Sequence, residues 1–304
     1  MKRFTFKSIS VKFLALVLSL CACAGVYMLA TANDSVKAEE VAVFAVEESA
    51  SIRDGATADD GYYGLRFTTN VNSIWLAEYE EGTTFTFGTL IFPASYVGNF
   101  DETASVDANK AATEAVKFLA KNNVALTSGF SYNASIVYDE AEATRLIKSV
   151  YGIEEPTPDQ IKTVLNNLYA MDMTAVSYVI VNGEVSYTNM YTTSMLKVAA
   201  RLARDEKWGA VAGNYIPGKI TFESAYVSDE DDVLVVDSKP VDFNSFETIF
   251  VGNKTLTAGV DYEVNEGVLT LSQEIIDANI RTYTDVYMLD ASGNLTVIEV
   301  LFAN

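Results

Sequence analysis

The side chains that could carry chemistry in this chain are carboxylates, arginines and tyrosines. Its 304 residues include no histidine and only two cysteines, Cys21 and Cys23. A Ser-His-Asp triad needs an imidazole base, and a histidine-ligated zinc or iron site needs imidazole ligands. The sequence also lacks a Walker-type glycine loop and a Gly-x-Gly-x-x-Gly turn. These observations exclude several large classes of enzyme.

Carboxylate chemistry remains open, because a glycosidase needs only two suitably placed acids and this chain has 41. No acidic pair stands in a recognisable strand-end context. The run from Asp229 to Asp232 is more simply a solvated loop. We therefore predict that the protein is not an enzyme, with a carboxylate-based glycosidase as the least favoured alternative.

Calcium is the one ion for which the composition offers ligands, since exported acidic modules hold it with carboxylate and carbonyl oxygens. The candidate loops run from Asp54 to Asp60 and from Asp229 to Asp232. Neither has the Asp-x-Asp-x-Asp-Gly spacing of a calcium loop, so ordinary acidic turns are the preferred interpretation. We predict no metal site and no cofactor.

Exposed aromatic rings could bind carbohydrate, because sugar rings stack on tyrosine and tryptophan faces. Tyr62, Tyr63 and Trp75 lie near predicted loops and form the candidate ligand-binding group. The competing interpretation is structural, since most of the 17 tyrosines and 16 phenylalanines occupy strand positions.

Two arginines, Arg53 and Arg66, fall in predicted strands and suggest an anion or carboxylate site. The alternative is that each is paired with an acid or with backbone carbonyls. Asp54, Asp101 and Glu102 are the acids that we consider as partners.

The N-terminus has the pattern of a secretion signal. Basic residues precede an almost purely apolar run over residues 13–30, which ends in small residues up to Ala32. We expect residues 1–32 to be a signal peptide cleaved after Ala32. Two alternatives stay open: the apolar run is retained as a short membrane anchor, or Cys23 is lipidated. In each case the protein is extracellular or attached to the cell envelope.

Loss of this signal leaves an acidic chain without thiols. The signal holds both cysteines and four basic residues but no acid, so the formal charge moves from −20 to −24. A polyanion repels nucleic acid and anionic membranes at long range. We therefore predict no nucleic-acid partner, and membrane contact only through the N-terminal segment if it is uncleaved or lipidated.

The rest of the chain is predicted to form a spacer over residues 33–48 and two domains, over residues 49–218 and 219–304. Short aromatic and β-branched runs predict strands in the first domain at residues 64–71, 85–92 and 130–138. The turn Asn182-Gly183 predicts a type I′ hairpin between strands at 176–181 and 184–191.

Helices alternate with these strands. For residues 158–170, Thr157 can cap the helix, Pro158 suits its first position and Gln160 completes a capping box. Asp139 is expected to cap another helix. Two further helices are predicted over residues 107–121 and 194–208. The first domain is therefore α+β, with helices packed on a mostly antiparallel sheet.

Only strands are predicted after Gly218, and explicit turns separate them. Seven short strands of this kind are typical of a β-sandwich. They are expected at residues 220–227, 233–236, 246–251, 262–264, 268–271, 282–289 and 295–302.

Three motifs of the first domain resemble a module of surface and secreted proteins of Firmicutes. They are Ala50-Ser51-Ile52-Arg53, Gly64-Leu65-Arg66-Phe67 and Gly88-Thr89-Leu90-Ile91, followed by a tyrosine-rich hairpin and helix over residues 178–208. Residues 250–276 are similar to immunoglobulin-like modules of bacterial cellulases and scaffoldins. The resemblance implies export and a C-terminal immunoglobulin-like β-sandwich, and it brings no catalytic residues.

The sequence thus predicts an exported, non-enzymatic binding protein of a Gram-positive bacterium. The expected ligand is cell-wall or dietary polysaccharide, or a surface protein. The alternative is a structural spacer or interaction module within an extracellular assembly.

Overall fold

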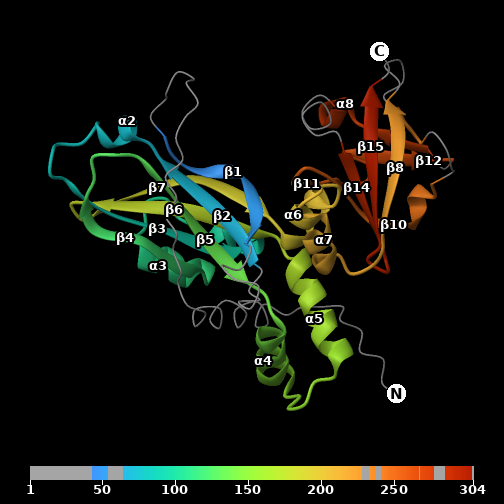
Figure 1. The fold of residues 1–304 in the computed structure, drawn as a ribbon, viewed down its shortest axis with the longest axis horizontal. Coiled ribbons are helices and arrows are strands. Elements are labelled where there is room, and N and C mark those ends of the chain that lie inside the picture. The colour runs from blue at the N-terminus through green and yellow to red at the C-terminus, as the bar shows by residue number, and fades with distance from the viewer. Residues whose placement is uncertain are drawn as a thin grey trace. The chain divides into compact units, whose positions relative to one another are not determined.

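A computed structural model describes residues 43–53, 64–227, 233–236, 241–266, 268–276 and 285–302. The predicted signal peptide and most of the predicted spacer lie outside these residues. The chain divides into two compact units, Met1–Met195 and Leu196–Asn304, each of which is described by itself (Figure 1). No helix in the described part of the chain is long and apolar enough to cross a membrane.

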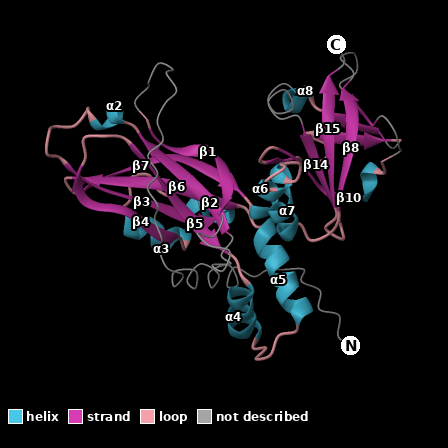
Figure 2. Cartoon of the chain, viewed as in Figure 1, coloured by secondary structure: helices cyan, strands magenta, loops and turns pink. Residues whose placement is uncertain are grey.

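The first unit contains two antiparallel sheets (Figure 2). One has the strand order β1-β2-β5 and the other has the order β4-β3-β6-β7. The antiparallel pairing agrees with the prediction, whereas the division into two sheets was not foreseen. The strands are β1 (Phe44–Arg53), β2 (Gly64–Val71), β3 (Thr84–Pro93), β4 (Val116–Ala125), β5 (Phe130–Val137), β6 (Met173–Val181) and β7 (Glu184–Thr193). Strand β1 begins inside the predicted spacer, because its first residues pair with β2.

Strand β2 shows why the two sheets pack against each other. Its buried residues alternate with half-buried ones, so one face of the strand is turned to the core. Leu65, Phe67 and Val71 lie on the buried face and Arg66 and Asn70 on the other. The β1-β2-β5 sheet therefore has one apolar face and one polar face.

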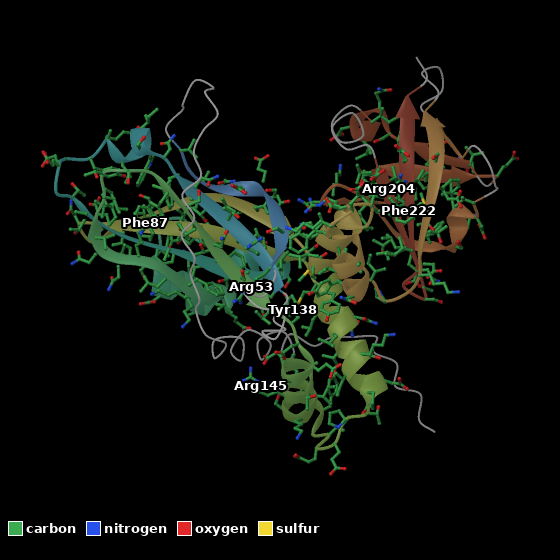
Figure 3. All side chains as sticks on the ribbon, in the orientation of Figure 1. Arg53, Phe87, Tyr138, Arg145, Arg204 and Phe222 are labelled. Carbon is green, nitrogen blue, oxygen red and sulfur yellow. The ribbon has the colours of Figure 1, made fainter. Side chains whose placement is uncertain are left out.

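Aromatic rings fill much of the space between the sheets. Phe87 of β3 is fully buried, and its ring lies 5.3–6.1 Å from four other aromatic rings (Figure 3). Buried hydroxyls also bridge the sheets: Thr69 of β2 lies 2.6 Å from Ser177 of β6. Tyr132 of β5 donates to the carbonyl of Gly88 at 3.0 Å. These bonds satisfy the polar groups that the sheet packing buries. The rings around Phe87 belong to Phe44, Trp75, Phe85 and Phe130.

Short helices cover the opposite face of the four-stranded sheet. Leu90, Phe92 and Tyr178 point to that face and pack with Tyr96 of the 3₁₀ helix η1 (Ala94–Asn99) and Val106 of α3 (Val106–Thr113). This layer agrees with the predicted packing of helices on an antiparallel sheet. The unit also contains α2 (Ser73–Leu76), α4 (Glu140–Tyr151) and α5 (Pro158–Ala170), and α4 and α5 lie side by side (Figure 1).

The helix predicted over residues 107–121 is wrong in its second half. Helix α3 ends at Thr113, because Glu114 adopts a left-handed conformation with φ 55°. The chain then enters β4, whose Phe118 pairs with Thr89 of β3. Alanine-rich composition favours a helix, but pairing with the edge of β3 prevails here.

Other local predictions are confirmed. Asn182 and Gly183 have φ values of 54° and 87°, as a type I′ hairpin requires. Helix α5 has the capping box of Thr157 and Gln160, and Asp139 caps α4. The helix predicted over residues 194–208 is shorter, since α6 spans Met195–Leu202 and α7 spans Gly209–Ala212.

The second unit holds one eight-stranded sheet with the order β11-β10-β14-β15-β8-β9-β13-β12. The seven predicted strands are all present, together with the short β11. The sheet is continuous because β9 pairs with both β8 and β13. The strands are β8 (Ile220–Val227), β9 (Val233–Val236), β10 (Phe246–Val251), β11 (Lys254–Thr255), β12 (Tyr262–Asn265), β13 (Val268–Leu271), β14 (Asp285–Asp290) and β15 (Leu295–Phe302).

Both ends of this sheet contribute to one core. Ile249 of β10 and Met288 of β14 are buried in the same cluster as Leu269 and Leu271 of β13. The sheet therefore curls over on itself to enclose apolar side chains. Besides α6 and α7, the described part of this unit contains the short helices η2 (Gly213–Tyr215), η3 (Phe243–Ser245) and α8 (Gln273–Ile275).

Helix α6 is attached to the outer face of the second sheet. Lys197 donates to the carbonyl of Asn253 at 3.1 Å, and Arg201 donates to the side chain of Asn253 at 2.9 Å. Arg204 forms an ion pair with Glu299 of β15 at 3.1 Å. These bonds explain why the second unit begins at Leu196, whereas the sequence placed the boundary at Gly218.

This attachment predicts how fragments of the second unit behave. One set of directly paired residues across β10, β14 and β15 lies on the outer face of the sheet and is buried. It consists of Phe250, Tyr287 and Val297. A fragment of residues 219–304 lacks α6, so we expect it to expose this set of residues and to aggregate or melt at a lower temperature than residues 194–304. Thermal unfolding followed by circular dichroism compares the two fragments. Equal melting temperatures would contradict the assignment of α6 to this unit.

A second prediction concerns the aromatic core of the first unit. Phe87→Ala removes a fully buried ring, so we expect a loss of about 3–5 kcal/mol in the free energy of unfolding. Leu119→Ala is the matched control, because Leu119 is 44% exposed and should cost about 0.5 kcal/mol. Urea denaturation monitored by tyrosine and tryptophan fluorescence measures both. A similar loss for the two variants would argue against this core.

Candidate functional site

The outward side of the β1-β2-β5 sheet carries short polar side chains on all three strands. Strand register places Arg66 between Ser51 and Ser135, Thr68 beside Asn133, and Asn70 beside Ser131. Their side chains are half-buried, as expected on the solvent side of a sheet. We call this surface the polar face, defined by Ser51, Arg53, Arg66, Thr68, Asn70, Ser131, Asn133 and Ser135.

Hydrogen bonds between neighbouring strands fix the amides and hydroxyls of the polar face. Thr68 donates to Asn133 Oδ1 at 2.9 Å, and Ser131 donates to Asn70 Oδ1 at 2.6 Å. Asn70 Nδ2 in turn donates to Glu47 Oε1 at 2.9 Å. Because these contacts set the side-chain orientations, the face presents a largely ordered array of donors and acceptors.

Some donors of the polar face have no partner among the described residues. They are the Asn133 amide nitrogen and the Ser135 hydroxyl. Each group can donate a hydrogen bond to an acceptor atom of a bound molecule. The array can therefore bind a ligand without breaking its own contacts.

Arg66 lies on the central strand β2, between the directly paired Ser51 of β1 and Ser135 of β5. Its Nε donates to Ser51 Oγ at 2.9 Å, and its Nη2 reaches the carbonyl of Ile52 at 3.5 Å. Of the acids considered as partners, Asp101 instead accepts from Thr103, and Asp54 lies outside the described residues. A hydroxyl and a backbone carbonyl therefore orient Arg66, and among the described residues no carboxylate does.

Of the predicted aromatic group, only Trp75 lies within the described residues. Tyr62 and Tyr63 lie outside the described residues. Trp75 of α2 packs 5.1 Å from Phe44 and 4.9 Å from Tyr79, ring centre to ring centre. These contacts give Trp75 a structural role at the end of the aromatic core.

Both candidate calcium loops also lie outside the described residues. Within the described ranges, no three acidic or thiol side chains gather as metal ligands would. The prediction of no metal site therefore stays a prediction.

Most acids with a shifted pKa are committed to local hydrogen bonds. Backbone amides and Lys254, which lies 3.0 Å away, lower the pKa of Asp261. Asn294 and neighbouring amides lower that of Asp290, and Thr103 lowers that of Asp101. Lys117 likewise lowers the pKa of Asp107. Such groups stay ionised and stabilise turns and helix ends, so they are poor candidates for proton transfer.

Asp285 behaves differently, because burial raises its pKa. It lies directly opposite Glu299 on the β14–β15 pair, and Tyr287 donates to its Oδ2 at 3.4 Å. Arg204 binds Glu299, and its guanidinium lies 5.1 Å from the ring of Phe222 (Figure 3). We assign no catalytic role to the two carboxylates, since the arginine that binds one of them also secures the α6 segment. We interpret this cluster as part of the helix attachment.

The sequence contained a signal for the polar face that was overlooked. Polar residues alternate with buried ones at Arg66, Thr68 and Asn70, and again at Ser131, Asn133 and Ser135. The candidate group Tyr62, Tyr63 and Trp75 does not include any of these positions. The two-residue period of short polar side chains on adjacent strands is the pattern that identifies the face.

Comparisons with known proteins add little to this geometry. No protein-family model matches the sequence, and no curated protein matches it. A solved structure described as "Biofilm associated protein - BSP domain" is similar with 12% identity and a TM-score of 0.25. The alignment covers 88% of this chain and 53% of that chain, so this protein corresponds to about half of that chain's length. A TM-score this low does not establish a shared fold.

The raised pKa of Asp285 generates a prediction with a defined sign. A carboxyl whose pKa is raised by folding stabilises the folded state while protonated, and this contribution is lost as the pH rises through the folded pKa. We expect Asp285→Asn to raise the melting temperature of the second unit at neutral pH. The difference should vanish in acid, where Asp285 is itself neutral.

The matched control for this experiment is Glu299→Gln, which breaks the ion pair with Arg204 and should lower the melting temperature at neutral pH. Differential scanning calorimetry between pH 4 and pH 8 separates the two effects. A lower melting temperature of Asp285→Asn at neutral pH would show that the charge of Asp285 is required.

Proposed function

We propose that this chain is an exported, non-enzymatic binding protein of a bacterial cell surface or secretome, and that the polar face binds polysaccharide. The observation that carries the proposal is the hydrogen-bonded array of Thr68, Asn70, Ser131 and Asn133 across the β1-β2-β5 sheet. An ordered surface of short polar side chains on three strands is well suited to a long, hydroxyl-rich polymer.

The chemistry of the array matches that of sugars. Hydroxyl and amide side chains both donate and accept, as the hydroxyls of a sugar do. Neighbouring strands are about 4.8 Å apart, and outward side chains repeat about every 7 Å along each strand. Side chains at this spacing can form hydrogen bonds with successive hydroxyl groups of an extended polysaccharide. Because the side chains are already oriented, little conformational entropy is lost on binding.

Export of the chain rests on the basic and apolar pattern of residues 1–32. The second unit is proposed to be an immunoglobulin-like module that acts as a spacer or interaction part. Its succession of short strands and their shared core support that assignment.

A second role, as an interaction module within an extracellular assembly, is favoured by one end of the second sheet. Strand β12 is the last strand of the sheet order, and Val260 just before it is 73% exposed. An edge strand beside an exposed apolar side chain offers a place for protein contact. The ligand on this side would be a surface protein.

A glycan array and a cell-wall pull-down with residues 33–304 test the proposal. Asn133→Ala removes an unpaired amide of the polar face, so we expect binding to weaken by roughly fivefold. Asn122→Ala is the matched control, because Asn122 is an exposed asparagine of β4 outside this face and accepts a comparable hydrogen bond from Thr86. No binding in either assay would contradict a role in polysaccharide recognition.

A further inference from the structure

We infer that the polar face selects an anionic polysaccharide and that Arg53 and Arg66 together hold its oxyanion. This inference rests on the proposed function, because it concerns the ligand class of the same face. It follows from the positions of the two arginines, from the partners of Arg66, and from the contrast with the ion-paired Lys117 and Arg145.

Strand register puts the two guanidinium groups on the same side of the sheet. Ser51 lies opposite Arg66 and is bonded to it, so both point away from the core. Arg53 follows Ser51 by two residues and therefore points the same way, as the burial of the intervening Ile52 requires. Figure 3 shows Arg53 at the end of β1.

Arg53 and Arg66 occupy diagonal positions on adjacent strands. Such neighbours are about 7–8 Å apart at the backbone, which is within reach of two long side chains. The residue opposite Arg53 is Gly64, which has no side chain to stand between the arginines. Any Cβ at position 64 would come within 2.4 Å of the Ile136 carbonyl, so glycine is required there. The pair can therefore converge on one anion.

The two arginines differ from Lys117 and Arg145 in having no acidic partner among the described residues. Lys117 is paired with Asp107 at 2.8 Å, and Arg145 is paired with Glu142. Among the described residues, no carboxylate lies within ion-pair distance of Arg53 or Arg66. In a chain with a formal charge of −20, the described residues thus leave two guanidinium groups on one face without a paired carboxylate.

Among the described residues, the acid that bonds to the polar face is Glu47, and it does not pair with either arginine. Glu47 accepts from Asn70 and from Ser49, and both bonds lie at the other end of β1 from Arg53. The guanidinium fork binds planar oxyanions through two parallel hydrogen bonds. Arg66 is already oriented by Ser51 and Ile52, which prepares it for such a contact.

The acidity of the whole chain limits this binding but does not prevent it. Repulsion between the chain and an anionic polymer acts at long range and is screened beyond about 10 Å at 0.1 M salt. Contacts with the two arginines are local and are reinforced by the neutral donors Asn133 and Ser135. The shared chemistry of the ligand is an oxyanion on a sugar, carried by a carboxylate or by a sulfate ester.

Isothermal titration with residues 33–304 tests the inference. The probes are polygalacturonate, its methyl-esterified form, which has the same sugar rings without charge, and dextran sulfate. We expect polygalacturonate to bind at least tenfold more tightly than the ester. Arg66→Gln and Arg53→Gln should each weaken that binding by roughly tenfold. Binding of dextran sulfate, if tighter and equally sensitive to both variants, would identify a sulfate ester as the oxyanion and support the inference.

Lys162→Gln is the control, because it removes the same charge from an exposed position on α5 and should leave binding unchanged. Equal binding of the acidic and esterified polymers, with no effect of the arginine variants but a loss in Asn133→Ala, would overturn the anion preference and leave the proposed function standing. Loss of binding in Lys162→Gln equal to that in Arg66→Gln would show a non-specific charge effect and overturn the inference. Absence of binding to all three polymers, together with a blank glycan array, would overturn both.

Discussion

The first unit depends on the two-residue alternation of β2, the central strand of its sheet. Leu65, Phe67 and Val71 must be buried for the two sheets to pack, so Arg66, Thr68 and Asn70 necessarily face outward. A shift of one residue in register would exchange the two sets and bury an arginine. The same constraint that forms the core therefore creates the polar face, and the stability of one is linked to the geometry of the other.

Buried polar contacts add specificity to this packing. Thr69 bonds Ser177 across the sheets, and Ser177 also lies 2.8 Å from Thr89. These hydroxyls satisfy one another only in a single relative position of the strands, so they select one register where apolar packing alone would tolerate others. In the second unit the same role falls to Lys197 and Arg201, whose bonds to Asn253 fix α6 on its sheet.

Helix caps and hairpin turns could be predicted from the sequence, because they depend on residues that are close together in the chain. The capping box of Thr157 and Gln160 and the hairpin turn at Asn182 depend only on neighbouring residues. The pairing of strands that are distant in the sequence could not be predicted. Residues after Glu114 were predicted as helix, yet they form β4 because they pair with the edge of β3. The same reason explains why one sheet was predicted where two exist, and why α6 was placed in the first domain.

The candidate site was missed for a related reason. Each polar strand position is ordinary by itself, and its meaning appears only when β1, β2 and β5 are laid side by side in register. Arg53 and Arg66 were recognised as a candidate anion site, but their diagonal arrangement on one face could not be derived without the pairing of their strands.

The most direct test of the central claim is to map the ligand contact by NMR. ¹H–¹⁵N spectra of residues 33–304 titrated with a short oligogalacturonate would report which amides and side chains sense the sugar. The account predicts shifts at Arg66, Thr68, Asn70, Asn133 and Ser135, with the second unit unaffected. Shifts confined to the second unit, or to the covered side of the four-stranded sheet, would contradict it.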